Sequence, residues 1–148
     1  MSLVIPFEDV TEADRPCVGG KAYALSIMAR TGAKVPSGVC VTVDAYRQYV
    51  RLSGLADRIR LELSRNRFAD MRWEEIWDAA LRISNMFLTA PLSQPLSRAI
   101  SEPLLQRFGE AAVVVRSSAP DEDSSRASFA GLHEHRSISG AMRRSWTM

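Results

Sequence analysis

The sequence predicts an α+β fold that is rich in helix. Apolar residues recur at every third or fourth position through the middle of the chain, as they do in amphipathic helices. Two runs of β-branched residues, 39–43 and 112–115, lie on either side of that middle and predict strands. The chain has 148 residues, 46% of them hydrophobic, which is enough for one domain with a real core and excludes disordered and low-complexity classes.

Charge and cysteine content narrow the class of protein. The 19 Lys and Arg against 17 Asp and Glu give a net charge of +2, and the signs are interspersed, so nucleic acid is not an expected partner. Cys17 and Cys40 show neither a metal-ligand spacing nor a disulfide framework, which favours a cytoplasmic protein. The start of the chain lacks the pattern of a signal peptide, and no stretch approaches about 18 consecutive apolar residues. We therefore expect neither secretion by a signal nor a membrane span.

The N-terminal segment predicts extended chain followed by a helix. Residues 1–18 begin with an apolar run that predicts a short edge strand, and a polar stretch follows it. A helix is predicted from Lys21 to Thr31, because glycine precedes it and Gly32 stands where helices end in the left-handed conformation.

A buried strand and a second helix are predicted next. Residues 39–43 are β-branched and continuous enough to predict a buried strand. Thr42 or Asp44 is expected to cap the helix that follows, which ends at Gly54.

The middle of the chain is predicted to be helical. Leu55, Ile59 and Leu63 are spaced as on one helix face. A longer stripe then repeats over four turns, and we expect it to be core and not a cofactor site. Its members are Trp73, Ile76, Trp77, Ala80, Leu81, Ser84, Phe87 and Leu88.

Prolines and a run of valines indicate the helix ends and the strand in the next segment. Pro91 and Pro95 are expected to end the long helix, and another helix is predicted over 96–108, with a kink or a restart at Pro103. Residues 112–115 form the strongest predicted strand and are expected to be buried. The polar and small-residue stretch after this strand is expected to be a functional loop.

Gly19, Gly20 and Lys21 form the first candidate site. Glycines let backbone N–H groups approach an anion, and a lysine at a helix N-terminus is unfavourable unless an anion neutralises it. A bound phosphate accounts for this placement, and a solvated lysine beside a turn is the alternative. The spacing is not that of a Walker A motif, because Arg15 and Ala22 occupy the places of its first glycine and its Ser/Thr.

Arg116 is the second candidate. It follows the valine run directly, so its guanidinium leaves the strand at a fixed point and can clamp phosphate oxygens with two hydrogen bonds. Ser117 adds a hydroxyl. The alternative is a structural ion pair with the acidic residues at 121–123, which we do not interpret as a magnesium site.

A small-residue loop with one aromatic is the third candidate. Residues 127–131 are of the kind that closes backbone over phosphates, although composition alone does not separate them from a plain surface loop. His133 and His135 follow without a third ligand at a suitable spacing, so we expect solvated histidines and no metal site.

Four segments in order carry a family resemblance. They are Val18–Leu25, Val35–Tyr46, Val113–Asp123 and Ala127–Gly131. Together they resemble the N-terminal ATP-binding domain of the phosphoenolpyruvate synthase and pyruvate phosphate dikinase family, which rifampin phosphotransferases share. The resemblance covers residues 1 to about 134 and implies the N-terminal half of an ATP-grasp domain.

The resemblance also implies roles for particular residues. Lys21 and Arg116 would hold the phosphates of ATP, and a loop would cover those phosphates with backbone amides. The loop residues are Ser128, Phe129, Ala130 and Gly131. In the family the phosphoryl group passes to a histidine on a separate domain and then to pyruvate, or to rifampin in the drug-modifying branch. No catalytic residue is assigned to this chain.

Parts of the family pattern are missing. The Mg²⁺ ligands, the phosphohistidine domain and the pyruvate domain have no counterpart here, so the chain is expected to be a fragment that is inactive alone. His133 and His135 are not taken as the phosphocarrier. The alternative is a non-catalytic remnant that binds a nucleotide or a partner. Apolar surface left open by the missing half would then favour a homodimer.

Residues 135–148 do not continue the family pattern. A shift of the reading frame by one base after Glu134 permits family-like residues, including an asparagine and a glycine in register. We therefore predict that residues 1–134 belong to the ATP-binding domain and that the tail arises from a frame error. Such a tail would be poorly ordered or packed opportunistically, with Trp146 as a stray apolar side chain. A genuine terminus is the alternative.

Overall fold

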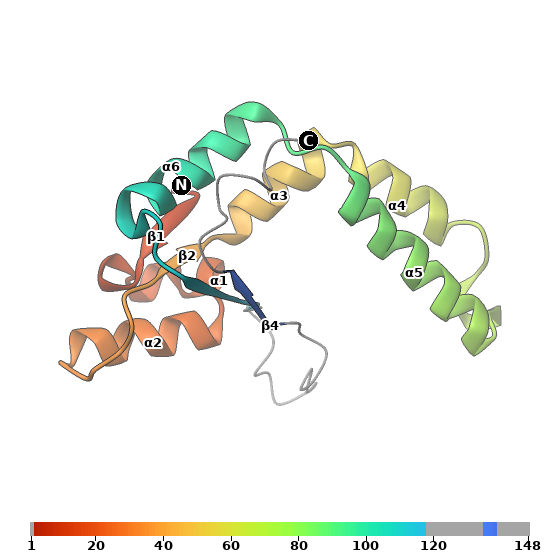
Figure 1. Cartoon of the computed structure of the whole chain (residues 1–148). Coiled ribbons are helices and arrows are strands. Elements are labelled where there is room, and N and C mark those ends of the chain that lie inside the picture. Colours follow the sequence, from red (N-terminus) through yellow and green to blue (C-terminus); the bar gives the residue numbers. More distant parts are fainter. Residues whose placement is uncertain (1, 118–134, 139–148) are drawn as a thin grey trace. The chain divides into compact units, whose positions relative to one another are not determined.

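The computed structural model describes residues 2–117 and 135–138 and confirms an α+β fold rich in helix (Figure 1). The helices are α1 (Arg15–Val18), α2 (Gly20–Arg30), α3 (Val43–Leu52), α4 (Leu55–Leu63), α5 (Trp73–Thr89) and α6 (Gln94–Phe108). The strands are β1 (Val4–Pro6), β2 (Val39–Val41), β3 (Val113–Arg116) and β4 (His135–Ile138). Short 3-10 turns are η1 (Phe7–Asp9), η2 (Glu12–Asp14) and η3 (Phe68–Asp70).

The chain divides into two compact units. Unit 1 comprises Met1–Ala45 and Ser97–Met148, and unit 2 comprises Tyr46–Leu96. The chain passes from one unit to the other within α3 and again within α6. The length alone had suggested one domain.

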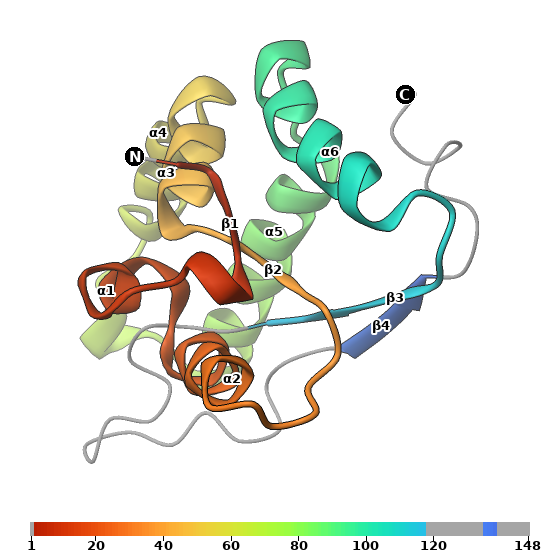
Figure 2. The same ribbon diagram turned by 90° about the vertical axis from the view of Figure 1, so that its left-hand side faces the viewer.

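A small core in unit 1 holds the N-terminal elements together. β1 pairs antiparallel with β2, with Val4 opposite Val41, and Figure 2 shows this pair with α1 and α2 beside it. The buried side chains come from four elements or turns: Val10, Val18, Ala22 and Cys40, with Ile5, Phe7 and Tyr23 packed against them. Because the core draws on residues 5–40, the segment around the Gly-Gly-Lys turn is held on several sides.

Arg107 connects the two sequence segments of unit 1. Its guanidinium donates to Glu8 at 2.6 Å and to the Ser37 hydroxyl at 3.0 Å. Hydrogen bonds from the Glu8 backbone and from Arg107 lower the pKa of the Glu8 carboxyl. The end of α6 is thereby tied to η1 and to the turn before β2.

The N-terminal segment is less extended than expected. Only Val4–Pro6 forms a strand, and residues 7–18 form η1, η2 and α1. The reason is local hydrogen bonding: the backbone N–H and the hydroxyl of Thr11 both donate to the Asp14 carboxylate, at 2.9 and 2.6 Å. These bonds lower the pKa of Asp14. Proline then stands in the first turn of α1, where its missing N–H costs nothing.

The predicted helix ending at Gly32 is confirmed. Gly32 has φ of 82°. Its N–H donates to the Ala29 carbonyl, and the Ala33 N–H donates to the Met28 carbonyl at 3.1 Å. This pair of bonds is the Schellman arrangement, which satisfies carbonyls at the helix end.

β2 is shorter and less buried than predicted. It ends at Val41, which is 50% exposed, while Cys40 is buried. Thr42 extends the contact with the N-terminal segment by one residue: its N–H donates to the Leu3 carbonyl and its hydroxyl to the Ser2 carbonyl, at 3.0 and 3.1 Å. Thr42 stands just before α3, as expected, but its hydroxyl serves the N-terminal segment.

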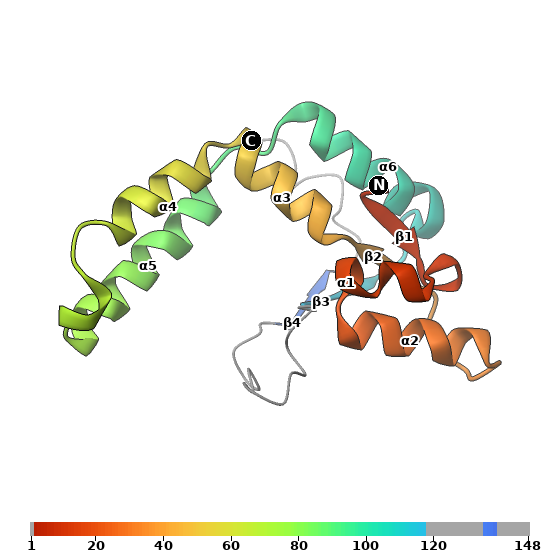
Figure 3. The same cartoon turned by 180° about the vertical axis from the view of Figure 1, so that it is seen from behind.

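Unit 2 is built on the antiparallel pair α4 and α5, which lie side by side (Figure 3). Leu55, Ile59 and Glu62 form the packed face of α4, whereas the predicted third member, Leu63, is 55% exposed. The Tyr49 hydroxyl donates to the Phe87 carbonyl at 2.9 Å, so α3 meets the C-terminal half of α5.

The stripe predicted as core on α5 is largely exposed, which corrects that prediction. Ile76 and Phe87 are half-buried, but six other members face solvent: Trp73, Trp77, Ala80, Leu81, Ser84 and Leu88. The sequence places apolar residues on two faces of α5, and the packed face, centred on buried Ala79, is only one of them.

The prolines act differently from the prediction. α5 ends at Thr89, before Pro91. Pro95 lies in the first turn of α6, where proline is tolerated, and does not end the preceding helix. α6 continues through Pro103, which removes one backbone donor from its interior.

β3 is confirmed as a strand, but the prediction that it is buried is wrong for two of its valines. Val114 is 64% exposed and Val115 is 53% exposed. β3 pairs antiparallel with β4, with Arg116 opposite His135. Within the described residues this sheet has two strands, β3 and β4.

Candidate functional site

Lys21 lies in the first turn of α2, at the positive end of the helix dipole. Gly19 precedes this turn with φ of 79° and ψ of 163°, a conformation that only glycine adopts without strain. The Tyr23 N–H donates to the Gly19 carbonyl at 3.0 Å and closes the turn. The predicted Gly-Gly-Lys turn at the head of a helix is therefore confirmed.

Two buried side chains anchor this turn. Val18, just before it, is 4% exposed, and Ala22, just after it, is 9% exposed. Both belong to the core of unit 1. Ala22 stands where a Walker A motif has Ser or Thr, and its place in the core suits a methyl group and not a hydroxyl. The core thus holds the backbone around Lys21 in one conformation.

A polar cluster that sequence reasoning missed borders the turn. The Tyr23 hydroxyl donates to the Glu12 carboxylate, and the Arg15 guanidinium lies 5.5 Å from the centre of the Tyr23 ring. Arg15 also pairs with Glu12 at 3.6 Å. The hydrogen bond to Glu12 raises the pKa of Tyr23. The i,i+3 spacing of Glu12 and Arg15 was a signal for their pairing, but nothing local connected them to Tyr23.

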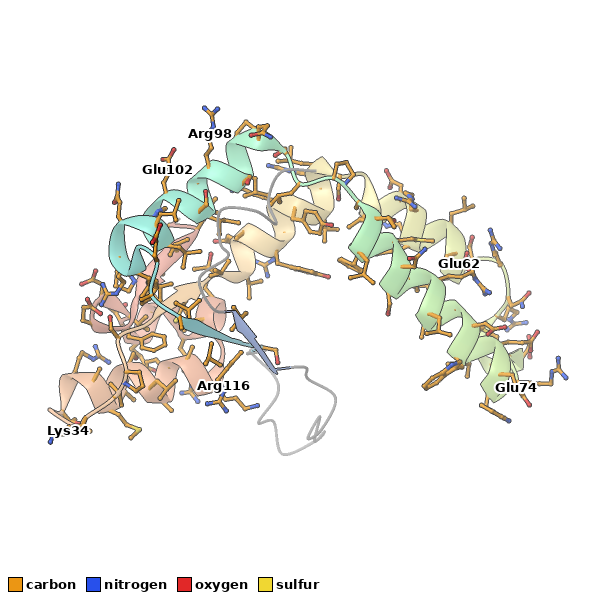
Figure 4. All side chains as sticks on the ribbon, viewed as in Figure 1. Lys34, Glu62, Glu74, Arg98, Glu102 and Arg116 are labelled. Atoms are coloured by element: carbon orange, nitrogen blue, oxygen red, sulfur yellow. The ribbon has the colours of Figure 1, made fainter. Side chains whose placement is uncertain are left out.

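Arg116 is the last residue of β3, and its side chain is exposed (Figure 4). Ser117 follows it. The Ser117 hydroxyl oxygen is buried and has no hydrogen-bond partner among the residues that the structure describes.

The structure brings two of the predicted site residues into one unit and leaves the others untested. Lys21 and Arg116 both belong to unit 1. The loop residues Ser128, Phe129, Ala130 and Gly131 lie outside the described residues, as do the acidic residues at 121–123.

Residues 2–117 and 135–138 hold no group of three or more His, Cys, Asp or Glu able to bind a metal ion. None of the helices in this part of the chain has the length and apolar character needed to span a bilayer.

A lysine at a helix N-terminus and an arginine at a strand end are groups that bind phosphate. Backbone N–H groups and the helix dipole favour an anion at the start of α2, and the guanidinium can bind two oxygens at once. Such groups position and neutralise a phosphoryl group and need no covalent step.

Several large phosphotransferases are similar to this chain in sequence. The chain is 36% identical over 137 residues to a phosphoenolpyruvate synthase of Aeropyrum pernix, covering 89% of this chain and 17% of that protein. It is 34% identical to a probable phosphoenolpyruvate synthase of Methanocaldococcus jannaschii, over 95% of this chain and 12% of that protein. A rifampicin phosphotransferase of Streptomyces sviceus is 36% identical, over 88% of this chain and 15% of that protein.

The chain spans less than a fifth of the length of these three relatives. Residues 15–136 match the family described as the pyruvate phosphate dikinase AMP/ATP-binding domain. This range includes both Lys21 and Arg116, and it covers most of the chain. The chain therefore belongs to the pyruvate phosphate dikinase AMP/ATP-binding domain family.

Proposed function

We propose that this chain holds the phosphates of ATP for a phosphoenolpyruvate synthase-like phosphotransferase. Lys21 and Arg116 bind phosphate oxygens, and residues 128–131 cover them with backbone amides. The observation that carries the proposal is the family match over residues 15–136, which spans both cations and this loop. The position of Lys21 at the start of α2 supports it, because the buried residues on either side fix the backbone there and the helix N-terminus favours an anion.

The remaining parts of the reaction lie outside the residues assigned here. In the complete enzyme, Mg²⁺ would supply charge neutralisation for the ATP phosphates, and a phosphohistidine would carry the phosphoryl group to pyruvate. Both cysteines are free thiols, which supports a cytoplasmic location.

A rifampin-type acceptor is the second candidate. The Streptomyces sviceus rifampicin phosphotransferase and the Aeropyrum pernix phosphoenolpyruvate synthase have the same identity to this chain, 36%. The similarity of this segment therefore favours ATP binding and does not separate the two acceptors.

Calorimetric titration of the purified chain with Mg·ATP tests the proposal. Lys21→Gln and Arg116→Gln should each weaken binding about 10- to 150-fold, since a charge-assisted hydrogen bond contributes roughly 1.5–3 kcal/mol. Lys34→Gln and Arg98→Gln are matched controls, because both side chains are exposed in unit 1 (Figure 4). The controls should retain wild-type affinity.

The same substitutions at the corresponding positions of a full-length relative extend the test to turnover. Thermal melting separates binding from folding. If Lys21→Gln and Arg116→Gln keep wild-type affinity and lose thermal stability, these two residues are structural and the proposal fails.

Self-association is the alternative role for the isolated chain. Apolar surface that remains open in unit 1 or unit 2 would favour a homodimer that binds a partner or a nucleotide without turnover. One exposed face of α5 is suited to this alternative.

A further inference from the structure

An exposed apolar face runs the length of α5. We call the α5 stripe the residues Trp73, Trp77, Ala80, Leu81, Ser84 and Leu88, which all face solvent. The two tryptophans are 71% and 62% exposed, and the leucines 54% and 81%. At 100° and about 1.5 Å per residue, these six positions share one face about 22 Å long.

The area of this face is large for a surface that stays in water. The indoles of Trp73 and Trp77 leave on the order of 300 Å² uncovered, since an aromatic side chain carries about 150–250 Å². Contiguous apolar patches of a few hundred Å² mark binding sites on soluble proteins. Two such faces in contact, with their leucines, approach the roughly 1,000 Å² that a stable interface needs.

Large and small side chains alternate along the stripe in a way that suits a second copy. If two α5 helices pair antiparallel about a point between Ala80 and Leu81, Trp77 of one copy lies opposite Ser84 of the other. Leu81 then lies opposite Ala80. Near the centre of the pair each large side chain therefore meets a small one, as in interdigitating helix pairs, and at the two ends Trp73 lies opposite Leu88.

Charges beside the stripe favour the same orientation. Glu74 and Asp78 are exposed along one edge in the N-terminal half, and Asn85 and Thr89 continue that edge in the C-terminal half. A parallel pair would instead set this edge against the opposite edge of the other copy, which carries the apolar residues Ile76, Ile83 and Phe87. The antiparallel pair sets Asp78 beside Asn85 and Glu74 beside Thr89, which are neutral hydrogen-bond donors.

We propose that two copies of this chain associate through the α5 stripe, with the two α5 helices antiparallel. The inference rests on the self-association put forward above and adds its surface and geometry. It requires no bound nucleotide, because the stripe lies in unit 2 whereas Lys21 and Arg116 lie in unit 1.

Sedimentation equilibrium of the full chain tests this inference. Trp77→Gln should raise the dimer dissociation constant at least tenfold. Ala80→Phe should raise it as well, although it adds apolar surface, because the larger ring occupies the place of Leu81 from the other copy. Leu61→Gln is the matched control: Leu61 is 67% exposed on α4, outside the stripe, and its loss should change the constant less than twofold.

Cross-linking tests the orientation. In a Cys17→Ser background, Leu81→Cys should form a disulfide between copies, because this residue lies near the two-fold axis, whereas Leu88→Cys should not. Circular dichroism confirms that each variant is folded. A wild-type chain that stays monomeric overturns both self-association and this surface, leaving the stripe to another partner. If the dimer dissociation constant is unchanged in Trp77→Gln and Ala80→Phe, the chain self-associates but the α5 stripe is not the interface.

Discussion

Glu62 is the buried carboxylate of unit 2. Its side chain is 3% exposed, and its two oxygens accept from Arg82 at 2.6 Å and from Arg65 at 3.2 Å. It occupies the packed face of α4, at the position that follows Leu55 and Ile59 in the i, i+4, i+7 series. A charge at this position is tolerated because both oxygens are paired, so Glu62 links α4 to α5.

Glu62→Gln should therefore destabilise the chain. An amide keeps the shape but loses the charge-assisted bonds, and we expect a loss of about 1.5–3 kcal/mol in the free energy of unfolding. Urea denaturation measures it. Glu74→Gln, at an exposed position of α5, should stay within about 0.5 kcal/mol of wild type. Equal losses in the two variants would show that the Glu62 pair contributes little.

The buried thiol of Cys40 makes the stability of the folded chain depend on pH. Burial raises the pKa of its thiol to about 11, from an ordinary value of 9.0. The folded state thus holds the proton more tightly than the unfolded state, and the stabilisation is fully present below pH 9 and lost between pH 9 and 11.

Cys40→Ala should lessen the loss of stability over that pH range. The informative quantity is the difference between wild type and variant, because the contributions of all other groups cancel in it. We expect the melting temperature of wild type to fall more steeply from pH 9 to pH 11. Parallel curves for the two proteins would contradict the assignment of the thiol as a titrating core group.

At the scale of elements, the sequence was sufficient to predict features that depend only on local backbone conformation. The end of α2 at Gly32 was predictable because a left-handed glycine acts within one helix turn. Which face of α5 is buried could not be predicted, because apolar residues lie on two sides of the helix and the sequence does not indicate which side packs against a neighbour. The exposure of β3 was missed for the same reason: a valine run predicts a strand but not its cover.

Gly19 determines how the chain enters α2. Its φ of 79° with ψ of 163° lies in a region reserved for glycine, whereas Gly54, with φ of 69° and ψ of 12°, is in the ordinary left-handed region. Gly19→Asn should cost about 1–3 kcal/mol. Gly54→Asn should cost less, because asparagine visits the left-handed region readily.

Thermal unfolding of the two asparagine variants measures this difference. We also expect Gly19→Asn, and not Gly54→Asn, to weaken Mg·ATP binding, because Gly19 sets the direction of the first turn that carries Lys21. Two variants of equal stability and equal affinity would show that the turn at Gly19 adjusts without strain.

At the scale of the whole molecule, the motifs of the candidate site could be predicted but not their assembly. Gly19, Gly20 and Lys21 form a local turn that the sequence indicates directly. Arg116 lies far along the chain, and its relation to Lys21 depends on how β3 joins unit 1, which no spacing rule predicts. The Glu12–Tyr23 contact was also not predicted from the sequence, because it depends on the core that brings η2 close to α2.

The origin of residues 135–148 remains a prediction of the sequence. Residues 135–138 form β4, but its ladder bonds come from backbone groups that almost any residue supplies, so the pairing is compatible with either reading frame. Sequencing the genomic DNA decides the matter. We expect the alternative frame after Glu134 to encode a continuation like that of the family. A frame without such a continuation would show that the tail is a genuine terminus.

The purified chain alone should show no pyruvate-dependent turnover of ATP. It spans between 12% and 20% of the phosphoenolpyruvate synthases it resembles, and the groups proposed here bind and neutralise phosphate without accepting it. Phosphoryl transfer to pyruvate additionally needs a nucleophile held in line with the terminal phosphate and metal ions to neutralise charge. Incubation with Mg·ATP and pyruvate, followed by quantification of AMP and phosphoenolpyruvate, measures this, with a full-length relative as positive control. Production of both compounds by the chain alone would show that its residues supply a complete active site.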